Sequence, residues 1–237
     1  VPTIDDVRRA ARRIAGVAVR TPLLANPILD ERTGVRVFLK CEVLQRTGSF
    51  KFRGAYNAVA AMNETERGHG VVAVSSGNHA QGVAEAARLY GIPATIVMPA
   101  DAPRIKRQRT ERSGARIVPY DRTGEDRDKV AAQVIGRVGG TLIHPYNDRN
   151  VIAGQGTIGL EIAEDCQGAG VTPDMVAVPC SGGGLSAGVG LALRDAYPGI
   201  AVMLVEPEGF DDYARSLEAG HPVSSVHTAG SVADTLL

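Results

Sequence analysis

A single lysine, Lys51, lies in a setting suited to amine chemistry. It stands between Phe50 and Phe52 at the start of a predicted helix, in a chain with only four lysines against twenty-two arginines. A primary amine can condense with an aldehyde to form a Schiff base, which a guanidinium cannot do. Lys51 is therefore a candidate for holding an aldehyde-bearing cofactor, and an ordinary solvated lysine is the alternative.

The start of this helix also bears on the charge of the lysine. Ser49 or Thr47 is expected to cap the helix, which would place Lys51 in the first helical turn. The positive end of the helix dipole and the two flanking phenylalanines disfavour an ammonium group there. We therefore expect a lowered pKa for Lys51 and a more nucleophilic amine.

A second motif, SSGNHAQG at residues 75–82, follows an apolar predicted strand and opens a helix. Two hydroxyls, a glycine and an amide at a helix N-terminus form an anion receptor suited to a carboxylate. A serine/asparagine capping turn is the alternative. The histidine of this motif, His79, is predicted to be structural rather than catalytic.

A third motif, CSGGGL at residues 180–185, joins another predicted strand to a helix rich in small residues. Three successive glycines let backbone N–H groups converge on an anion with no side chains in the way. The spacing matches neither a nucleotide P-loop nor a dinucleotide-binding turn, so a phosphate monoester fits better. A purely structural glycine turn is the alternative.

Together these three turns offer an amine, a carboxylate receptor and a phosphate receptor. A phosphorylated aldehyde cofactor that holds an amino acid requires all three. Pyridoxal 5'-phosphate is the economical interpretation.

The elements that must position these turns alternate along the chain. Short β-branched runs predict the strands Arg36–Lys40, Val71–Ser76, Ala94–Pro99, Arg116–Tyr120, Thr141–Pro145, Met175–Cys180 and Ala201–Pro207. The predicted helices are Phe52–Met62, His79–Tyr90, Pro103–Ser113, Lys129–Val138, Val151–Cys166, Leu185–Tyr197 and Asp211–Ala219. Such alternation predicts an α/β fold with parallel sheets covered on both faces and a ligand at the carboxyl ends of the strands.

Composition excludes several classes of function. The chain has 237 residues, and its 26 basic and 26 acidic residues balance, so neither a nucleic-acid nor a membrane-surface partner is expected. No apolar run reaches the length of a membrane span, and no signal-peptide pattern occurs. The three cysteines, Cys41, Cys166 and Cys180, are far apart and favour no disulfide framework. A reducing cytoplasm is therefore the expected location.

Several motifs in order resemble the fold-type II pyridoxal-phosphate enzymes, specifically the threonine/serine dehydratase and serine racemase family. They are CEVLQRTG at 41–48 with the lysine motif, SSGNHAQ at 75–81, HPY at 144–146 with AGQGT at 153–157, SGGG at 181–184 and VEPE at 205–208. The resemblance implies two doubly wound parallel-sheet domains of the tryptophan synthase β type. Residues 1–47 and 145–237 would form the large domain, and residues 48–144 a small inserted domain.

The resemblance also implies roles for individual residues. Lys51 would hold the cofactor and later act as the base at Cα, while Ser76 would act as acid/base on the opposite face in a racemase. Phe50 would pack near the cofactor ring, and Asn78 would hydrogen-bond its phenolic oxygen. The residues implied for the phosphate are Ser181, Gly182, Gly183, Gly184 and Leu185. The residues implied for the substrate carboxylate are Ser75, Ser76, Gly77 and His79.

The stretch EPEGFDD at 206–212 resembles a divalent-cation site of the same family. Glu206 and Asp212 would supply carboxylates and Phe210 a backbone carbonyl to Mg²⁺, Mn²⁺ or Ca²⁺. A helix N-terminus enriched in acidic residues is the alternative. In the later segment Ser231–Leu236, Thr235 stands where the family turn often ends in glycine. The family continues beyond the position of Leu237, where it supplies the residue that contacts the pyridine nitrogen.

The implied function is a threonine/serine ammonia-lyase that converts a β-hydroxy amino acid to a 2-oxo acid and ammonia, with serine racemisation as a side activity. A cysteine-synthase-like β-replacement enzyme is one alternative. A non-catalytic module that binds the cofactor or an amino acid is another. A homodimer is the family expectation.

Overall fold

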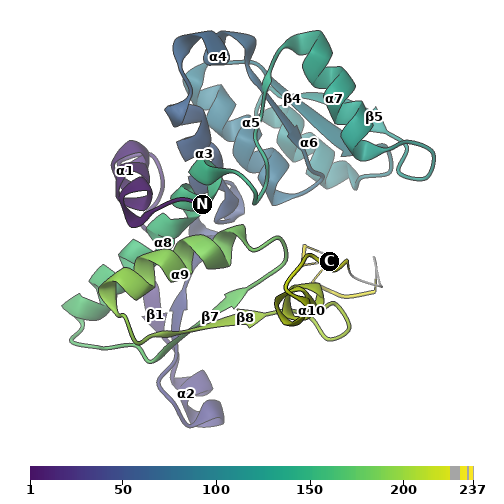
Figure 1. The fold of residues 1–237 in the computed structure, drawn as a ribbon. Helices are drawn as coiled ribbons and strands as arrows, with labels where there is room; N and C mark the ends of the chain where they lie inside the picture. Colours follow the sequence, from purple (N-terminus) through teal and green to yellow (C-terminus); the bar gives the residue numbers. More distant parts are fainter. Residues whose placement is uncertain (225–229, 234, 237) are drawn as a thin grey trace.

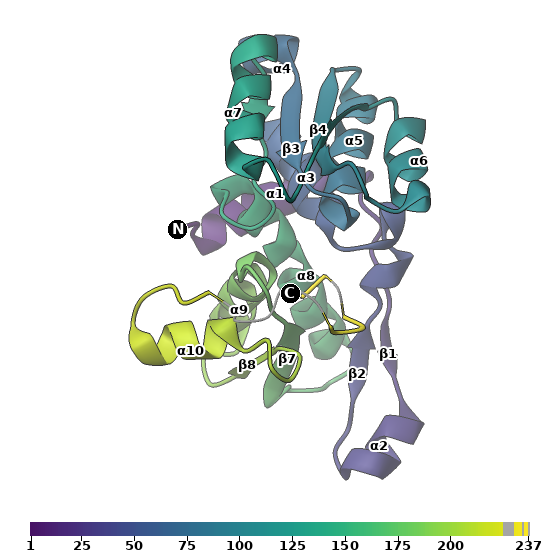
Figure 2. The same ribbon diagram turned by 90° about the vertical axis from the view of Figure 1, so that its right-hand side faces the viewer.

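The computed structural model describes residues 1–224, 230–233, 235 and 236. Its upper part in Figure 1 holds a four-stranded sheet, and its lower part holds a two-stranded sheet with long helices. The helices α3 (Lys51–Ala61) and α8 (Arg149–Gly168) lie where the two parts meet (Figure 1; Figure 2). The predicted family turn at Ser231–Leu236 includes Asp234, which lies outside the described residues.

The four-stranded sheet is parallel and has the order β5-β4-β3-β6. Its strands are β3 (Val71–Val74), β4 (Ala94–Pro99), β5 (Arg116–Tyr120) and β6 (Thr141–Leu142). The helices of this part are α4 (Glu64–His69), α5 (Asn78–Tyr90), α6 (Arg104–Arg112) and α7 (Arg127–Val138). Alternate side chains of β3 face opposite cores: Val71 and Ala73 pack in the cluster with α3 and α5, whereas Val72 packs with Val134 of α7. This sheet is therefore doubly wound, as predicted.

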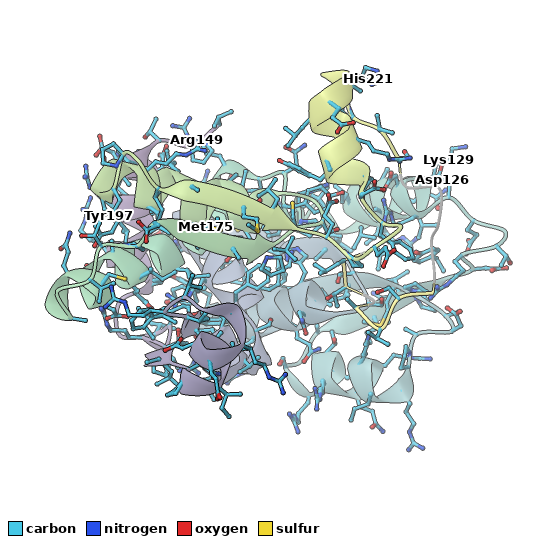
Figure 3. The ribbon with its side chains drawn as sticks, turned by 90° about the horizontal axis from the view of Figure 1, so that it is seen from below. Asp126, Lys129, Arg149, Met175, Tyr197 and His221 are labelled. Carbon is cyan, nitrogen blue, oxygen red and sulfur yellow. The ribbon has the colours of Figure 1, made fainter. Side chains whose placement is uncertain are left out.

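The second parallel sheet consists of β7 (Met175–Pro179) and β8 (Ala201–Val205). Val178 of β7 packs with α8 and α9 (Gly184–Ala196), while α10 (Asp212–Ala219) follows β8. The opposite face carries Met175, which Figure 3 labels, and Met203. Both side chains are about half exposed. Helices therefore cover one face of this sheet in the described part of the chain.

The N-terminal segment departs from the predicted pattern. A first helix, α1 (Ile4–Ile14), begins with a capping box between Thr3 and Asp6 and buries an apolar stripe that includes Val7. The strands β1 (Leu23–Ala25) and β2 (Phe38–Lys40) then pair antiparallel, with α2 (Pro27–Thr33) between them. The sequence predicts the second of these strands, as Arg36–Lys40, but not β1 or its antiparallel pairing, because β1 has only three residues and shows no strand pattern in the sequence.

Helices α3 and α8 cross with their backbones in contact. A Cβ at Gly54 would lie 2.7 Å from the Val151 carbonyl oxygen, and one at Gly154 would lie 2.6 Å from the Gly54 Cα. Only glycine permits this approach, which brings the start of α3 close to the segment before α8. In the described part of the chain, no helix is long and apolar enough to cross a bilayer.

Candidate active site

The turn before Lys51 is built from two residues with left-handed backbone conformation, Thr47 (φ 66°) and Gly48 (φ 79°). Helix α3 begins at Lys51, so this residue occupies the first turn as predicted. The predicted cap was wrong. Phe50 takes the N-cap position with helical dihedral angles, and no side chain caps the helix. Thr47 Oγ1 and Ser49 Oγ are instead buried without a hydrogen-bond partner, so the lysine turn holds two unpaired hydroxyls.

The Lys51 side chain is half-buried. Its Nζ donates a hydrogen bond to the Pro145 carbonyl oxygen at 3.0 Å and lies 5.2 Å from the centroid of the Phe50 ring. Burial lowers the pKa of Lys51 to about 8. A lysine at its ordinary pKa would be almost wholly protonated at neutral pH, so this shift raises the fraction of neutral, nucleophilic amine.

The serine-rich turn lies against the same helix start. A Cβ at Gly82 of α5 would be 3.2 Å from the Lys51 carbonyl carbon, which shows how closely the two helices approach. Within the turn, Ser75 Oγ accepts a hydrogen bond from the Gly77 N–H at 3.1 Å. Ser76 and Asn78 are both half-buried beside this bond. The structure therefore places the predicted carboxylate receptor next to the lysine.

His79 serves as a buried anchor in this structure. Its Nε2 lies 2.8 Å from the Ile143 carbonyl oxygen, and because a carbonyl can only accept, Nε2 carries the proton. Burial lowers the pKa of His79 to about 3, so the ring stays neutral at physiological pH. This contact supports the structural role expected for His79. Its implied part in framing a substrate carboxylate stays a prediction.

The glycine loop starts α9 without a side-chain cap. Gly183 is the N-cap with φ 77°, and no side chain bonds the first-turn N–H groups. A Cβ at Gly182 would overlap the Tyr146 ring, and one at Gly184 would lie 2.8 Å from the Tyr146 Cα. The loop is therefore packed so tightly on Tyr146 that side chains are excluded, and its amides are available to an anion.

A segment that was not predicted to be part of the site joins the lysine to the glycine loop. Pro145 supplies the carbonyl that binds the Lys51 amine, and the next residue, Tyr146, packs on Gly182 and Gly184. His144 Nδ1 fixes this segment by accepting the Asn147 N–H at 2.9 Å. The HPY motif was the available signal, since it overlaps the end of the predicted strand Thr141–Pro145, but its contacts depend on tertiary structure.

In the structure, Glu206 of the predicted cation site binds the first N–H groups of a helix. Both oxygens of Glu206 accept backbone N–H groups at the start of α10, from Tyr213 at 2.9 Å and Ala214 at 3.0 Å. Phe210 is buried and Asp212 is the first residue of α10. No cluster of three or more His, Cys, Asp or Glu side chains arranged for a metal occurs among the described residues. The alternative of acidic residues at a helix N-terminus thus has direct support, because Glu206 accepts two N–H groups there, and the cation site stays a prediction.

Glu206→Ala is expected to lower the free energy of unfolding by about 1–2 kcal/mol, because two helix N–H groups lose their charged acceptor. The measurement is chemical denaturation in the presence of a chelator, which removes any contribution from metal. Glu208→Ala is the matched control, since Glu208 is exposed and is expected to change stability by less than about 0.5 kcal/mol. Equal stabilities of the two variants would contradict the capping role.

Comparison with known proteins agrees with this geometry. Residues 14–236 match the family described as pyridoxal-phosphate dependent enzymes. An L-threo-3-hydroxyaspartate ammonia-lyase from Pseudomonas is 47% identical over 97% of this chain and 70% of its own length. An L-threonine ammonia-lyase from Thermotoga maritima is 45% identical over 92% of this chain and 53% of its own length. The structure of maize serine racemase superposes with a TM-score of 0.94 at 41% identity, over 99% of this chain and 70% of that one.

The chain therefore belongs to the pyridoxal-phosphate dependent enzymes of fold type II, within the group that contains ammonia-lyases and amino-acid racemases. The site fits this cofactor on its own geometry. It places a half-buried amine of lowered pKa beside a glycine loop whose packing excludes side chains. The predicted family and fold class are confirmed.

Proposed function

We propose that this chain is an ammonia-lyase that converts L-threonine or L-serine to a 2-oxo acid and ammonia. One observation carries the proposal. The Lys51 amine bonds the Pro145 carbonyl, and the adjoining Tyr146 packs on the glycine loop, so amine and anion receptor belong to one site. The serine-rich turn beside Lys51 supports binding of an amino-acid carboxylate.

The roles of the residues follow from this placement. When bound, pyridoxal phosphate supplies an electron sink that stabilises the charge left when Cα loses its proton. The N–H groups at Gly184 and Leu185 would bind its phosphate, while Phe50 and Asn78 would contact its ring. Lys51 would hold the cofactor and then, as a neutral amine, take the proton from Cα. The lowered pKa of Lys51 suits both tasks.

The direct test is the visible absorption spectrum of the protein loaded with pyridoxal phosphate, before and after L-threonine or L-serine is added. A band that borohydride removes and that changes with substrate, together with release of 2-oxo acid, is the expected result. A loaded protein that forms such a band but releases no oxo acid would support the non-catalytic binding module. No band at all would overturn the proposal.

A second candidate substrate is L-threo-3-hydroxyaspartate, favoured by the Pseudomonas relative of 47% identity that is named for it. The ratio of kcat/KM values for hydroxyaspartate, threonine and serine decides between the candidates. Cysteine formation from O-acetylserine and sulfide would instead indicate the β-replacement alternative.

The same proposal includes binding of Mg²⁺, Mn²⁺ or Ca²⁺ at Glu206 and assembly as a homodimer. Metal binding is tested by the shift in melting temperature when each cation is added, and the dimer by light scattering.

Ser76→Ala is expected to stop the conversion of L-serine to D-serine, because the hydroxyl would no longer return a proton to the opposite face of Cα. A loss of at least about 100-fold is expected, the lower range for removal of a general acid/base. The measurement is chiral chromatography of products from the variant and the parent at equal enzyme concentration. Unchanged racemisation by the variant would exclude this role for Ser76.

A further inference from the structure

Arg53, two residues after Lys51, is the largest fully buried side chain among the described residues. Its guanidinium bonds two carboxylates from separate elements. Glu42, in the 3-10 turn Glu42–Leu44, accepts from Nε and Nη2 at 2.9 Å each. Glu161 of α8 accepts from Nη1 at 2.6 Å and from Nη2 at 2.9 Å. The guanidinium therefore bridges the N-terminal segment and α8 with two paired hydrogen bonds on each side.

The remaining contacts complete this pairing. The Arg53 Nη1 group also lies 3.3 Å from Thr157 Oγ1, and Nη2 lies 3.1 Å from the Val19 carbonyl oxygen. Burial lowers the pKa of Arg53, but the hydrogen bonds to Glu42 and Glu161 outweigh it and raise the pKa above its ordinary value. The charge is thus fully compensated, as a buried ion pair requires.

Helix geometry connects this network to the lysine. Successive residues of an α-helix are rotated by about 100°, so residues two apart point to nearly opposite sides. Arg53 points towards Glu42 and Glu161, while Lys51 points towards Pro145. Fixing the guanidinium on one side of α3 therefore fixes the rotation of its first turn, and with it the direction of the amine on the other side.

We propose that Arg53 is a positioning residue for Lys51, acting through the rotation of the first turn of α3. The inference rests on the proposed function only in taking Lys51 as the reacting amine. Arginine is required because its planar guanidinium can donate two hydrogen bonds to each of two carboxylates at the same time, whereas the ammonium group of lysine cannot. A displacement of about 1 Å at a reacting group can lower the rate on the order of 100-fold.

The test is Arg53→Lys, which keeps the buried positive charge and removes the fork. In the cofactor-loaded enzyme we expect kcat to fall on the order of 100-fold with little change in KM, because binding groups stay in place. In the cofactor-free chain we expect the pKa of Lys51 to rise from about 8 towards about 10.4, the ordinary lysine value, as the amine gains access to water. This pKa is measured from the pH dependence of amine labelling, read at Lys51 by peptide mass spectrometry.

Lys40→Met is the matched control. Lys40 is also nearly buried and also pairs with Glu161, at 2.8 Å, but its other hydrogen bonds go to Asp165 and the Thr21 carbonyl oxygen rather than to α3. The Lys40→Met variant is expected to be less stable than the parent but to keep the parental kcat and the parental pKa of Lys51. If Arg53→Lys does not fold, Glu42→Gln replaces it, since the amide N–H groups would face one of the two Arg53 donors, Nε–H or Nη2–H, and break that half of the pair.

Two results would overturn the proposal. One is an Arg53→Lys enzyme with the parental kcat and the parental Lys51 pKa. The other is a Lys40→Met enzyme whose kcat and Lys51 pKa change as much as those of Arg53→Lys. That result would show that the network only stabilises the fold. Failure of the proposed function can be told apart from failure of this inference. If the parent releases no oxo acid, the pKa of Lys51 can still be measured in the parent and in Arg53→Lys, and the two values can be compared.

Discussion

Lys51→Ala is expected to abolish release of 2-oxo acid, the largest effect among the substitutions proposed for this chain. The substitution removes both the amine that would hold the cofactor and the base that would take the Cα proton. Loss of the base alone is worth about 10²–10⁴-fold in rate. The measurement is oxo-acid formation over long incubation with saturating threonine, together with the visible spectrum after pyridoxal phosphate is added.

The matched control for this variant is Lys129→Ala. Lys129 is an exposed lysine near the start of α7, and the hydrogen bond there to Asp126 uses its backbone N–H rather than its amine. We expect parental activity from this control. Oxo-acid release by Lys51→Ala within tenfold of the parental rate would rule out Lys51 as the reacting amine.

The second large effect is expected from a single methyl group in the glycine loop. Gly184→Ala would place a Cβ 2.8 Å from both the Tyr146 Cα and the Tyr146 carbonyl oxygen, and backbone atoms cannot move aside cheaply. Overpacking of this kind costs about 1–3 kcal/mol. Relieving the overlap has to shift the loop amides that would bind the phosphate, so we expect cofactor binding to weaken by about 5- to 150-fold. Titration of the cofactor-free protein with pyridoxal phosphate, followed by absorbance, measures the change.

Gly136→Ala controls for a general effect of adding a methyl group to a glycine. Gly136 lies within α7, is exposed, and has nothing within 4 Å of an added Cβ. Alanine there is expected to leave cofactor affinity unchanged and to stabilise the helix by about 0.5–1 kcal/mol. Parental cofactor affinity in Gly184→Ala would show that the loop does not bind the phosphate in the way proposed.

Elements with strong local signals were predicted well from the sequence. The strands Ala94–Pro99 and Arg116–Tyr120 have the predicted bounds, because their apolar runs are flanked by polar and turn residues. The predicted strand Thr141–Pro145 was too long, since pairing with β3 ends at Leu142. Beyond that point the chain turns to bring Pro145 to Lys51, a tertiary contact with no local pattern.

In the candidate site, too, features with a local sequence signal could be predicted and tertiary contacts could not. Lys51 and the glycine loop were predicted as site residues because their residue types are unusual in the turn before a helix, and their roles stay predictions. The cap expected from Ser49 was wrong, because Phe50 already adopts the helical conformation and takes the N-cap position. The partners of Arg53 could not be predicted, since Glu161 lies 108 positions away and carboxylates are common in the sequence.

These long separations have a consequence for the order in which the molecule forms. Strands β3, β4 and β5 pair over short stretches, as Val71 does with Ala94, whereas β6 returns from Thr141 to pair with Val71, and Lys51 and Pro145 are 94 positions apart. Closing longer loops costs more chain entropy, and contacts of high sequence separation form slowly. During synthesis the lysine leaves the ribosome well before the glycine loop, so the sheet can fold while the site is still incomplete. We therefore expect the chain to capture the cofactor late in its maturation, after the glycine loop has been synthesised and folded.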